Sequence, residues 1–180
     1  IYFKLPSKVE EAFSETSTTY NQSEIETKKA DIKIGKVENT EYEVKSDGIY
    51  WQGKKLDNPE NKSHTQLIEA DIERRRQEEL KEQTRLGYYY ESDFKHDWQK
   101  KNRDEYLKDP IQFLENSISI AKENLKRDPL NRISQNVIND SQSELDKIRE
   151  INAKYDAELA ELEKQQPPQG KGEGDWSAEQ

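Results

Sequence analysis

The chain has 180 residues, of which 37% are charged and 30% hydrophobic, and its formal net charge is −9 at pH 7. Leu, Ile, Val and Phe together make up just under one fifth of it, a range in which chains often bury too little apolar surface to fold alone. The negative charge argues against a nucleic acid or an anionic membrane as the main partner. The absence of Cys excludes disulfides, Cys-ligated metals and thiol nucleophiles. We therefore expect an extended or satellite subunit of an assembly.

Residues 1–29 are typical of an extended arm or linker, because Ser, Thr and Asn compete with the helix backbone for hydrogen bonds. Methionine is absent even at position 1, so we do not expect Ile1 to be the encoded start. Residues 30–56 predict a small antiparallel β-meander. Its first strand is expected where Ala30, Ile32 and Ile34 alternate with charged residues.

A β-hairpin over residues 41–52 is the clearest part of this meander. Tyr42 and Val44 alternate with charged residues, and the turn Ser46-Asp47-Gly48 leads into a β-prone run. Tyr50 and Trp51 lie next to each other in that run, so their side chains point to opposite faces of the strand. We expect one of them to cover a partner element, since an isolated hairpin is only marginally stable in water.

Residues 63–108 predict a charged helix followed by an aromatic one. The first helix is expected to begin at Ser63 or Thr65 and to end near Leu86, with Gly87 as its stop. Its pairs at i,i+3 and i,i+4, such as Asp71 with Arg75, contribute a few tenths of a kcal/mol each. The basic run 74–76 is flanked by Glu, which favours a helix laced with ion pairs over a phosphate site.

The aromatic helix is expected to carry Tyr90, Phe94 and Trp98 in one stripe, since these residues are four apart. Such a stripe is typical of an interface hot spot, because Tyr and Trp often anchor protein contacts. A small hydrophobic core beneath the β-hairpin is the favoured interpretation of the same stripe.

Residues 109–165 predict a helical hairpin or a coiled coil. Two nearly identical junctions, Asp109-Pro110 and Asp128-Pro129, combine an N-capping Asp with a Pro at the first helical position. Because the residue before Pro is pushed out of the α region, each preceding helix should end there. We therefore expect helices over about 110–126 and 129–165.

The second of these helices carries a heptad seam. It starts with Leu130, Ile133 and Val137 and then shifts register, which resembles a stutter or a change of packing partner. The shifted seam consists of Ile138, Ser141, Leu145, Ile148, Asn152, Tyr155, Leu159 and Leu162. A buried Asn such as Asn152 often fixes the register of a coiled coil. Packing within the chain and a homo-oligomer through 138–164 remain equally open.

No constellation of catalytic residues is apparent, and we expect no cofactor and no metal. The best candidate is the group Asp93, His96 and Asp97, which lacks a third well-placed ligand. No glycine-rich phosphate loop or nucleophile elbow occurs, and the glycines near Lys171 lie in the Pro/Gly-rich tail 166–180. No apolar run approaches the roughly 20 residues needed to span a bilayer.

The sequence thus predicts a mainly α-helical, non-enzymatic structural or adaptor subunit that binds other protein subunits. Virions, tails and secretion machines contain such chains, although that link is an association only. The interface candidates are Tyr50, Trp51, Tyr90, Phe94, Trp98, Leu145, Ile148, Asn152, Tyr155, Leu159 and Leu162. An acidic inhibitor or nucleic-acid mimic that fills a basic cleft is the alternative, although Lys and Arg are interspersed among the acidic residues.

Overall fold

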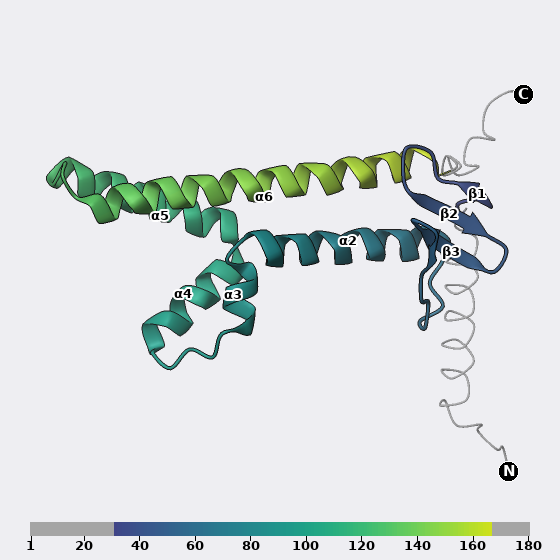
Figure 1. Cartoon of the computed structure of the whole chain (residues 1–180), viewed down its shortest axis with the longest axis horizontal. Helices are drawn as coiled ribbons and strands as arrows, with labels where there is room; N and C mark the ends of the chain where they lie inside the picture. The colour runs from purple at the N-terminus through teal and green to yellow at the C-terminus, as the bar shows by residue number, and fades with distance from the viewer. Residues whose placement is uncertain (1–30, 167–180) are drawn as a thin grey trace, which may run out of the picture.

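The structure is a computed structural model that describes residues 31–166. The expected arm over 1–29 lies outside the described residues, as does the expected tail apart from Gln166. The described part is mainly α-helical, with a small antiparallel sheet near its beginning (Figure 1). The predicted fold class is therefore confirmed.

The sheet has four strands in the order β1-β2-β3-β4, all antiparallel, within the described residues. These strands are β1 (Gly35–Lys36), β2 (Tyr42–Lys45), β3 (Gly48–Trp51) and β4 (Lys54–Lys55). The predicted hairpin is confirmed, with Lys45 paired to Gly48 across a two-residue turn. Gly48 has a φ of +150°, which side-chain-bearing residues rarely adopt.

The strand expected around Ile32 and Ile34 is wrong, because pairing starts only at Gly35. Ile32 is buried in the core beneath the sheet, whereas Ile34 is 69% exposed. Residues 32–34 therefore alternate because one side of this segment is covered, although the segment does not pair with β2.

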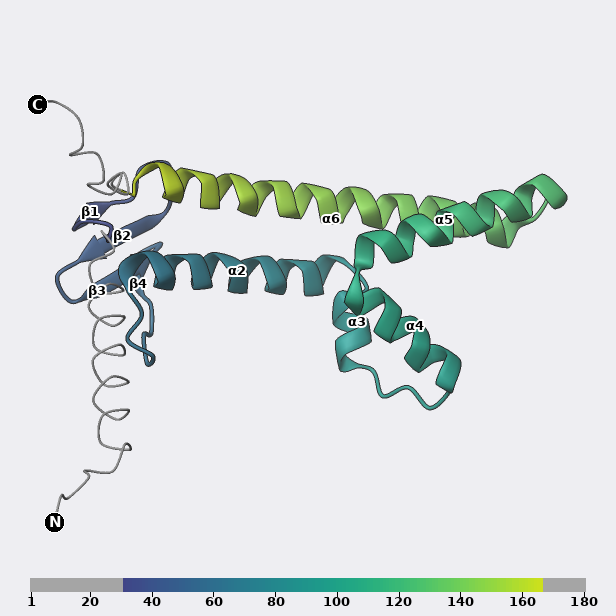
Figure 2. The same ribbon diagram turned by 180° about the vertical axis from the view of Figure 1, so that it is seen from behind.

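Five helices follow in residues 31–166: α2 (His64–Gln83), α3 (Leu86–Glu91), α4 (Asp97–Lys108), α5 (Pro110–Arg127) and α6 (Arg132–Lys164). They form an elongated body in which α6 is the longest element (Figures 1 and 2). The sheet lies at the C-terminal end of α6. There α2 runs alongside α6, and α5 covers its other half, while α3 and α4 project from the middle (Figure 2).

The helix starts show which capping signals the chain uses. Ser63 caps α2 in a capping box with Gln66, and Asp109 caps α5 ahead of Pro110, as predicted. The predicted start near Pro129 is wrong, since α6 begins at Arg132 after the cap Asn131. The Asp128 carboxylate instead accepts the backbone N–H of Leu130 and shapes the turn between α5 and α6.

The apolar side chains form two cores. The first joins the sheet, α2 and the C-terminal half of α6, and contains Val37, Tyr42, Val44, Ile49, Ile68, Ile72, Ile151, Tyr155 and Leu162. The second joins α3, α4, α5 and the earlier part of α6, and contains Leu86, Tyr106, Leu114, Ile118, Leu145 and Ile148. One helix therefore supplies side chains to both cores, which explains its length.

Candidate protein-interaction surfaces

The α5–α6 hairpin ends in an apolar surface that no described residue covers. We call residues 116–139 the hairpin tip. Leu130 is 89% exposed and Ile133 77% exposed, and Val137 and Ile120 are also exposed. Ile133 and Val137 share one side of α6, because their spacing matches the helical repeat, and Leu130 lies in the turn just before this helix. Four large apolar side chains exposed in one region are typical of an interaction site, whereas a hairpin surface that only faces water is mostly polar.

The helix packing explains why these side chains stay outside. The α6 residues that face α5 include Ser134 and Ser141, which are 4% and 2% exposed, opposite a face of α5 that carries the buried Ala121. Small side chains let two helices approach closely. The apolar stripe that begins the predicted seam is therefore turned outward, and the register shift after Val137 marks where the apolar stripe becomes covered.

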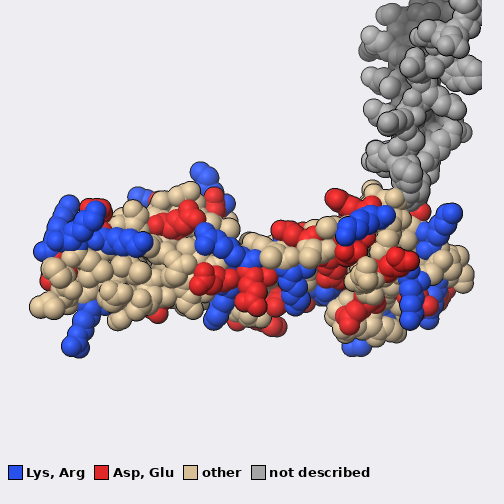
Figure 3. Space-filling model, turned by 90° about the horizontal axis from the view of Figure 1, so that it is seen from above, with Lys and Arg blue, Asp and Glu red and all other residues tan. Residues whose placement is uncertain are grey.

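The hairpin tip is also basic, in contrast to the chain as a whole. It carries the four cations Lys122, Lys126, Arg127 and Arg132 against the two anions Glu123 and Asp128, a net charge of +2. All six side chains belong to exposed residues. In Figure 3 a broad tan surface at the hairpin end is bordered by blue side chains.

The predicted aromatic stripe does not exist as a single helix. The helix α3 ends at Glu91 and α4 begins at Asp97, so Phe94 lies in the connecting loop. Phe94 is buried and packs edge-on against Tyr88, with ring centroids 5.5 Å apart. Tyr90 and Trp98 are 58% and 63% exposed. The expected core beneath the β-hairpin is therefore wrong for these aromatics, since the sheet rests on α2 and α6.

The other predicted interface residues fall into two groups. Tyr50 and Trp51 do point to opposite faces: Trp51 packs on the first core, and the Tyr50 hydroxyl donates to Asp47 at 2.7 Å. In the heptad seam, Leu145, Ile148, Tyr155 and Leu162 are buried within the chain, and Asn152 and Leu159 are half-buried. A homo-oligomer through 138–164 would therefore have to open contacts that this fold already uses.

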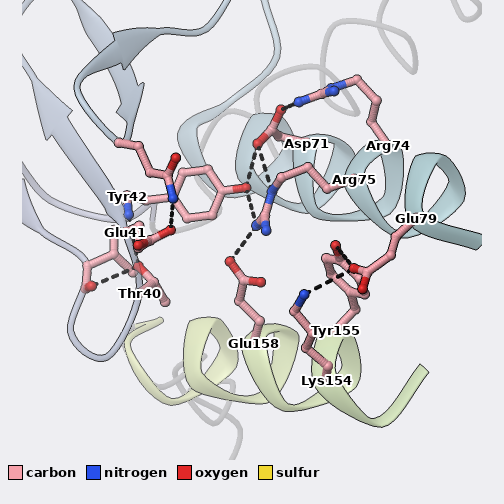
Figure 4. A network of polar contacts seen from close by, with 12 residues as sticks. Thr40, Glu41, Tyr42, Asp71, Arg74, Arg75, Glu79, Lys154, Tyr155 and Glu158 are labelled. Atoms are coloured by element: carbon pink, nitrogen blue, oxygen red, sulfur yellow. Dashed lines mark hydrogen bonds and ion pairs between the residues drawn. The ribbon is translucent and has the colours of Figure 1, made fainter. Parts of the chain in front are cut away.

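A buried polar network ties the sheet to α2 and α6 (Figure 4). The Tyr42 hydroxyl donates to Asp71 at 2.6 Å, and Arg74 donates to the other Asp71 oxygen at 2.8 Å. Arg75 donates to the Tyr42 oxygen at 2.8 Å and also bonds to Glu158 on α6. Burial, followed by the hydrogen bond to Asp71, raises the pKa of Tyr42 far above its usual range, so the phenol stays protonated.

The sequence did not indicate that this network is buried. Asp71 and Arg75 have the i,i+4 spacing of an ordinary surface pair, yet Asp71 is only 7% exposed. Burial alone would lower the pKa of Arg75, but hydrogen bonds to Glu158 and Tyr42 raise it, so the guanidinium remains charged. The rest of the basic run matches the predicted ion-paired helix, since Arg76 pairs with Glu73 and with Asp156.

Beside the network lies an open hollow of about 950 Å³ between α2, α6 and the sheet, which we call the acidic groove. The half-buried Trp51 supplies aromatic surface to its lining, to which Tyr155 also belongs although it is only 4% exposed. Its two cations, Arg75 and Lys154, stand against six carboxylates, a net charge of −4: Glu41, Glu78, Glu79, Glu82, Glu158 and Glu161.

The carboxylates of the groove differ in how far they are already engaged. Glu79 accepts the Tyr155 hydroxyl at 2.6 Å and Lys154 at 3.0 Å, and these hydrogen bonds hold its pKa below the usual range. Glu78 pairs with Arg74 at the rim. Glu82 is exposed on the same side of α2. Glu158 pairs with Arg75 and Glu161 with Lys164, so among residues 31–166 the groove keeps uncancelled negative charge chiefly at Glu41 and Glu82.

The candidate metal group is dispersed in the structure. Asp93 lies in the loop before α4, His96 is the residue that precedes this helix, and Asp97 opens it, with all three exposed. Among residues 31–166, no three His, Asp or Glu side chains are placed to share a metal ion. None of the helices in this range combines the length and the apolar character that crossing a bilayer requires.

Comparisons with protein-family models, with curated proteins and with solved structures found no match to this chain.

Proposed function

We propose that this protein is a non-enzymatic structural or adaptor subunit that binds other protein chains within an assembly. The observation that carries the proposal is the uncovered apolar face of the hairpin tip, where Leu130 and Ile133 are 89% and 77% exposed. Burying such a side chain stabilises a contact by about 1.5–3 kcal/mol. A partner that covers both side chains gains a substantial part of the free energy that association requires.

The elongated body supports the same proposal. One end is braced by the sheet, whereas the hairpin tip projects away from it (Figure 1). A projecting helical hairpin with an apolar end can insert into a groove on a partner through side chains one helical turn apart. Tyr90 on α3 and Trp98 on α4 each expose further aromatic surface.

An acidic inhibitor of a basic cleft is the weaker candidate. Its support is the groove, with six carboxylates against two cations. Elsewhere on the described surface the charges are interleaved, as in the pairs Arg149 with Glu115 and Lys126 with Glu123. A mimic of nucleic acid needs a continuous negative surface, so the adaptor function is favoured.

The proposal is tested by placing a photo-crosslinking amino acid at position 133 of the full chain, in cells that make it. Gln135 provides the matched control, because it is exposed on the opposite side of α6, about 200° around the helix. We expect a discrete protein adduct from position 133 and none from position 135, with the attached peptide identified by mass spectrometry. Absence of an adduct at 133, or equal adducts at both positions, would contradict the proposal.

A further inference from the structure

The hairpin tip and the acidic groove lie on opposite halves of the molecule and have opposite charge. The tip carries a net charge of +2 and exposes large apolar side chains. The groove lining carries a net charge of −4 and includes aromatic surface. Figure 3 shows red side chains in the middle and toward the sheet end, with blue side chains among them. The charge of the tip is therefore complementary to the charge of the groove.

A single copy cannot bring these two surfaces together. Residues 133 and 158 both lie on the continuous helix α6, and 25 residues at 1.5 Å each separate them by about 37 Å. The rigid helix keeps the tip away from the groove of its own chain. Any contact between them must form between two molecules.

We infer that the hairpin tip of one copy docks into the acidic groove of a second copy. This inference rests on the proposed function, because it names the partner that the tip binds. Leu130 and Ile133 would meet the surface that the half-buried Trp51 supplies, and the tip cations would face carboxylates such as Glu82.

Such a contact is heterologous, since two different surfaces of the same chain meet. It leaves a free tip on one copy and a free groove on the other, so copies add in one direction and form an open filament or a closed ring. Complementary charge also raises the association rate and makes the contact sensitive to salt. The net charge of −9 opposes association between copies, so the local attraction between tip and groove must outweigh this repulsion.

The test uses two double variants whose changed residues are all exposed. The tip variant is Lys126→Glu with Arg127→Glu, and the groove variant is Glu78→Lys with Glu82→Lys. Lys100→Glu with Lys101→Glu on α4 is a control that makes the same change in net charge as the tip variant. Circular dichroism checks that every variant keeps its helices, and sedimentation velocity gives the molar mass over a wide concentration range.

We expect the unchanged chain and the control to grow in mass with concentration, less so at high salt. Each of the other variants alone should stay monomeric, with affinity reduced about tenfold or more. Their mixture should form a one-to-one complex, because the groove variant keeps a functional tip and the tip variant keeps a functional groove. Leu130→Ser should weaken association without a change of charge.

Several outcomes would overturn the inference. A monomeric unchanged chain at all concentrations excludes self-docking, as does a mixture that shows no complex. Loss of association in the α4 control would mean that net charge, and not the two surfaces, governs it. The crosslink at position 133 separates this failure from that of the proposed function, since an adduct with a different protein keeps the adaptor function and rejects the second copy.

Discussion

The two ends of α6 are held by different physical means. At the sheet end, a buried carboxylate, Asp71, joins α2 to the sheet through Tyr42, and Arg75 extends the link to α6. At the hairpin end, α5 and α6 meet through small and apolar side chains, and the outer face of α6 stays uncovered. One helix is thus fixed by specific polar contacts at the end that supports the sheet, whereas its outer face has no covering element at the end that projects.

The middle of the molecule combines both means. Glu144 on α6 accepts the backbone N–H of Arg85 at 2.8 Å and the Tyr106 hydroxyl at 3.0 Å, and it pairs with the Arg85 side chain. Burial raises the pKa of Tyr106 above its usual range, and Glu144 adds to this shift although the hydrogen bond with Thr84 opposes it, so the Tyr106 hydroxyl remains a donor. This carboxylate fixes α3 and α4 to α6 at the point where the chain leaves α2.

The substitution Asp71→Ala is expected to destabilise the sheet end more than any other change considered below. It leaves the Tyr42 hydroxyl without its acceptor and removes an ion pair from the buried Arg75, so we expect a loss of about 3–5 kcal/mol in the free energy of unfolding. Urea denaturation measures this loss. Glu69→Ala, at an exposed position two residues earlier on the same helix, should change stability by about 0.5 kcal/mol or less. Similar effects for the two variants would refute the structural role of the network.

Substitutions of Leu130, in the turn before α6, and of Leu145, within α6, compare the uncovered tip with the buried part of the hairpin. Leu145 is 1% exposed in the second core, whereas Leu130 is 89% exposed at the tip. We expect Leu145→Ala to cost about 2–4 kcal/mol, because it leaves a cavity, and Leu130→Ala to cost about 0.5 kcal/mol or less in the monomer. Thermal or urea unfolding measures the loss in the free energy of unfolding for both variants. A large cost for Leu130→Ala would place this side chain in a core.

The close approach of α5 and α6 predicts a smaller effect. Ser134→Leu introduces bulk at a position that is 4% exposed, so it should force the helices apart and cost about 1–3 kcal/mol. Ser143→Leu provides the control, because Ser143 is exposed on α6. If Ser134→Leu were as stable as the control, the small residues would not be what sets the distance between the helices.

The smallest effect concerns the start of α2 at the sheet end. The Asp31 carboxylate accepts the backbone N–H groups of His64 and Thr65, at 2.7 and 2.9 Å. Burial would raise its pKa, but these hydrogen bonds outweigh burial and lower it. A lowered pKa in the folded state means that the contribution is present above about pH 4 and is lost as the pH falls through the folded-state pKa.

The substitution Asp31→Asn keeps a capping acceptor but removes the titration. We therefore expect the stability of the unchanged chain to fall more steeply below about pH 4 than that of the variant, by about 1 kcal/mol or less for this half-buried cap. Urea unfolding across the acidic range measures both slopes. Parallel pH profiles would show that Asp31 does not contribute through its charge.

Several local features could be predicted from the sequence because they depend on nearby residues. Ser63, Asp109 and Pro110 act within one helical turn of themselves, and the turn at Ser46-Asp47 acts between two adjacent strands. The dipeptide Asp128-Pro129 shows the limit of such signals. The reversal between α5 and α6 requires a turn there, and Asn131 offers a competing cap three residues later.

The surfaces could not be predicted in the same way. Tyr90, Phe94 and Trp98 share a helical spacing, yet the chain bends between α3 and α4, which buries Phe94 and exposes the other two. Leu130 and Ile133 have the composition of a core and lie in solvent. Spacing defines a face only if the helix continues, and it never specifies which face a neighbouring element will cover.

The helical character, the small antiparallel sheet and several helix boundaries could be predicted from the sequence, since propensity, capping and periodicity are local properties of the chain. Three outcomes are visible only in the tertiary structure. The heptad seam packs within one molecule, Asp71 is buried among Tyr42, Arg74 and Arg75, and the apolar tip is left uncovered. These outcomes depend on contacts between residues far apart in the chain. Their energies are fixed by how closely whole helices pack, which no single segment encodes.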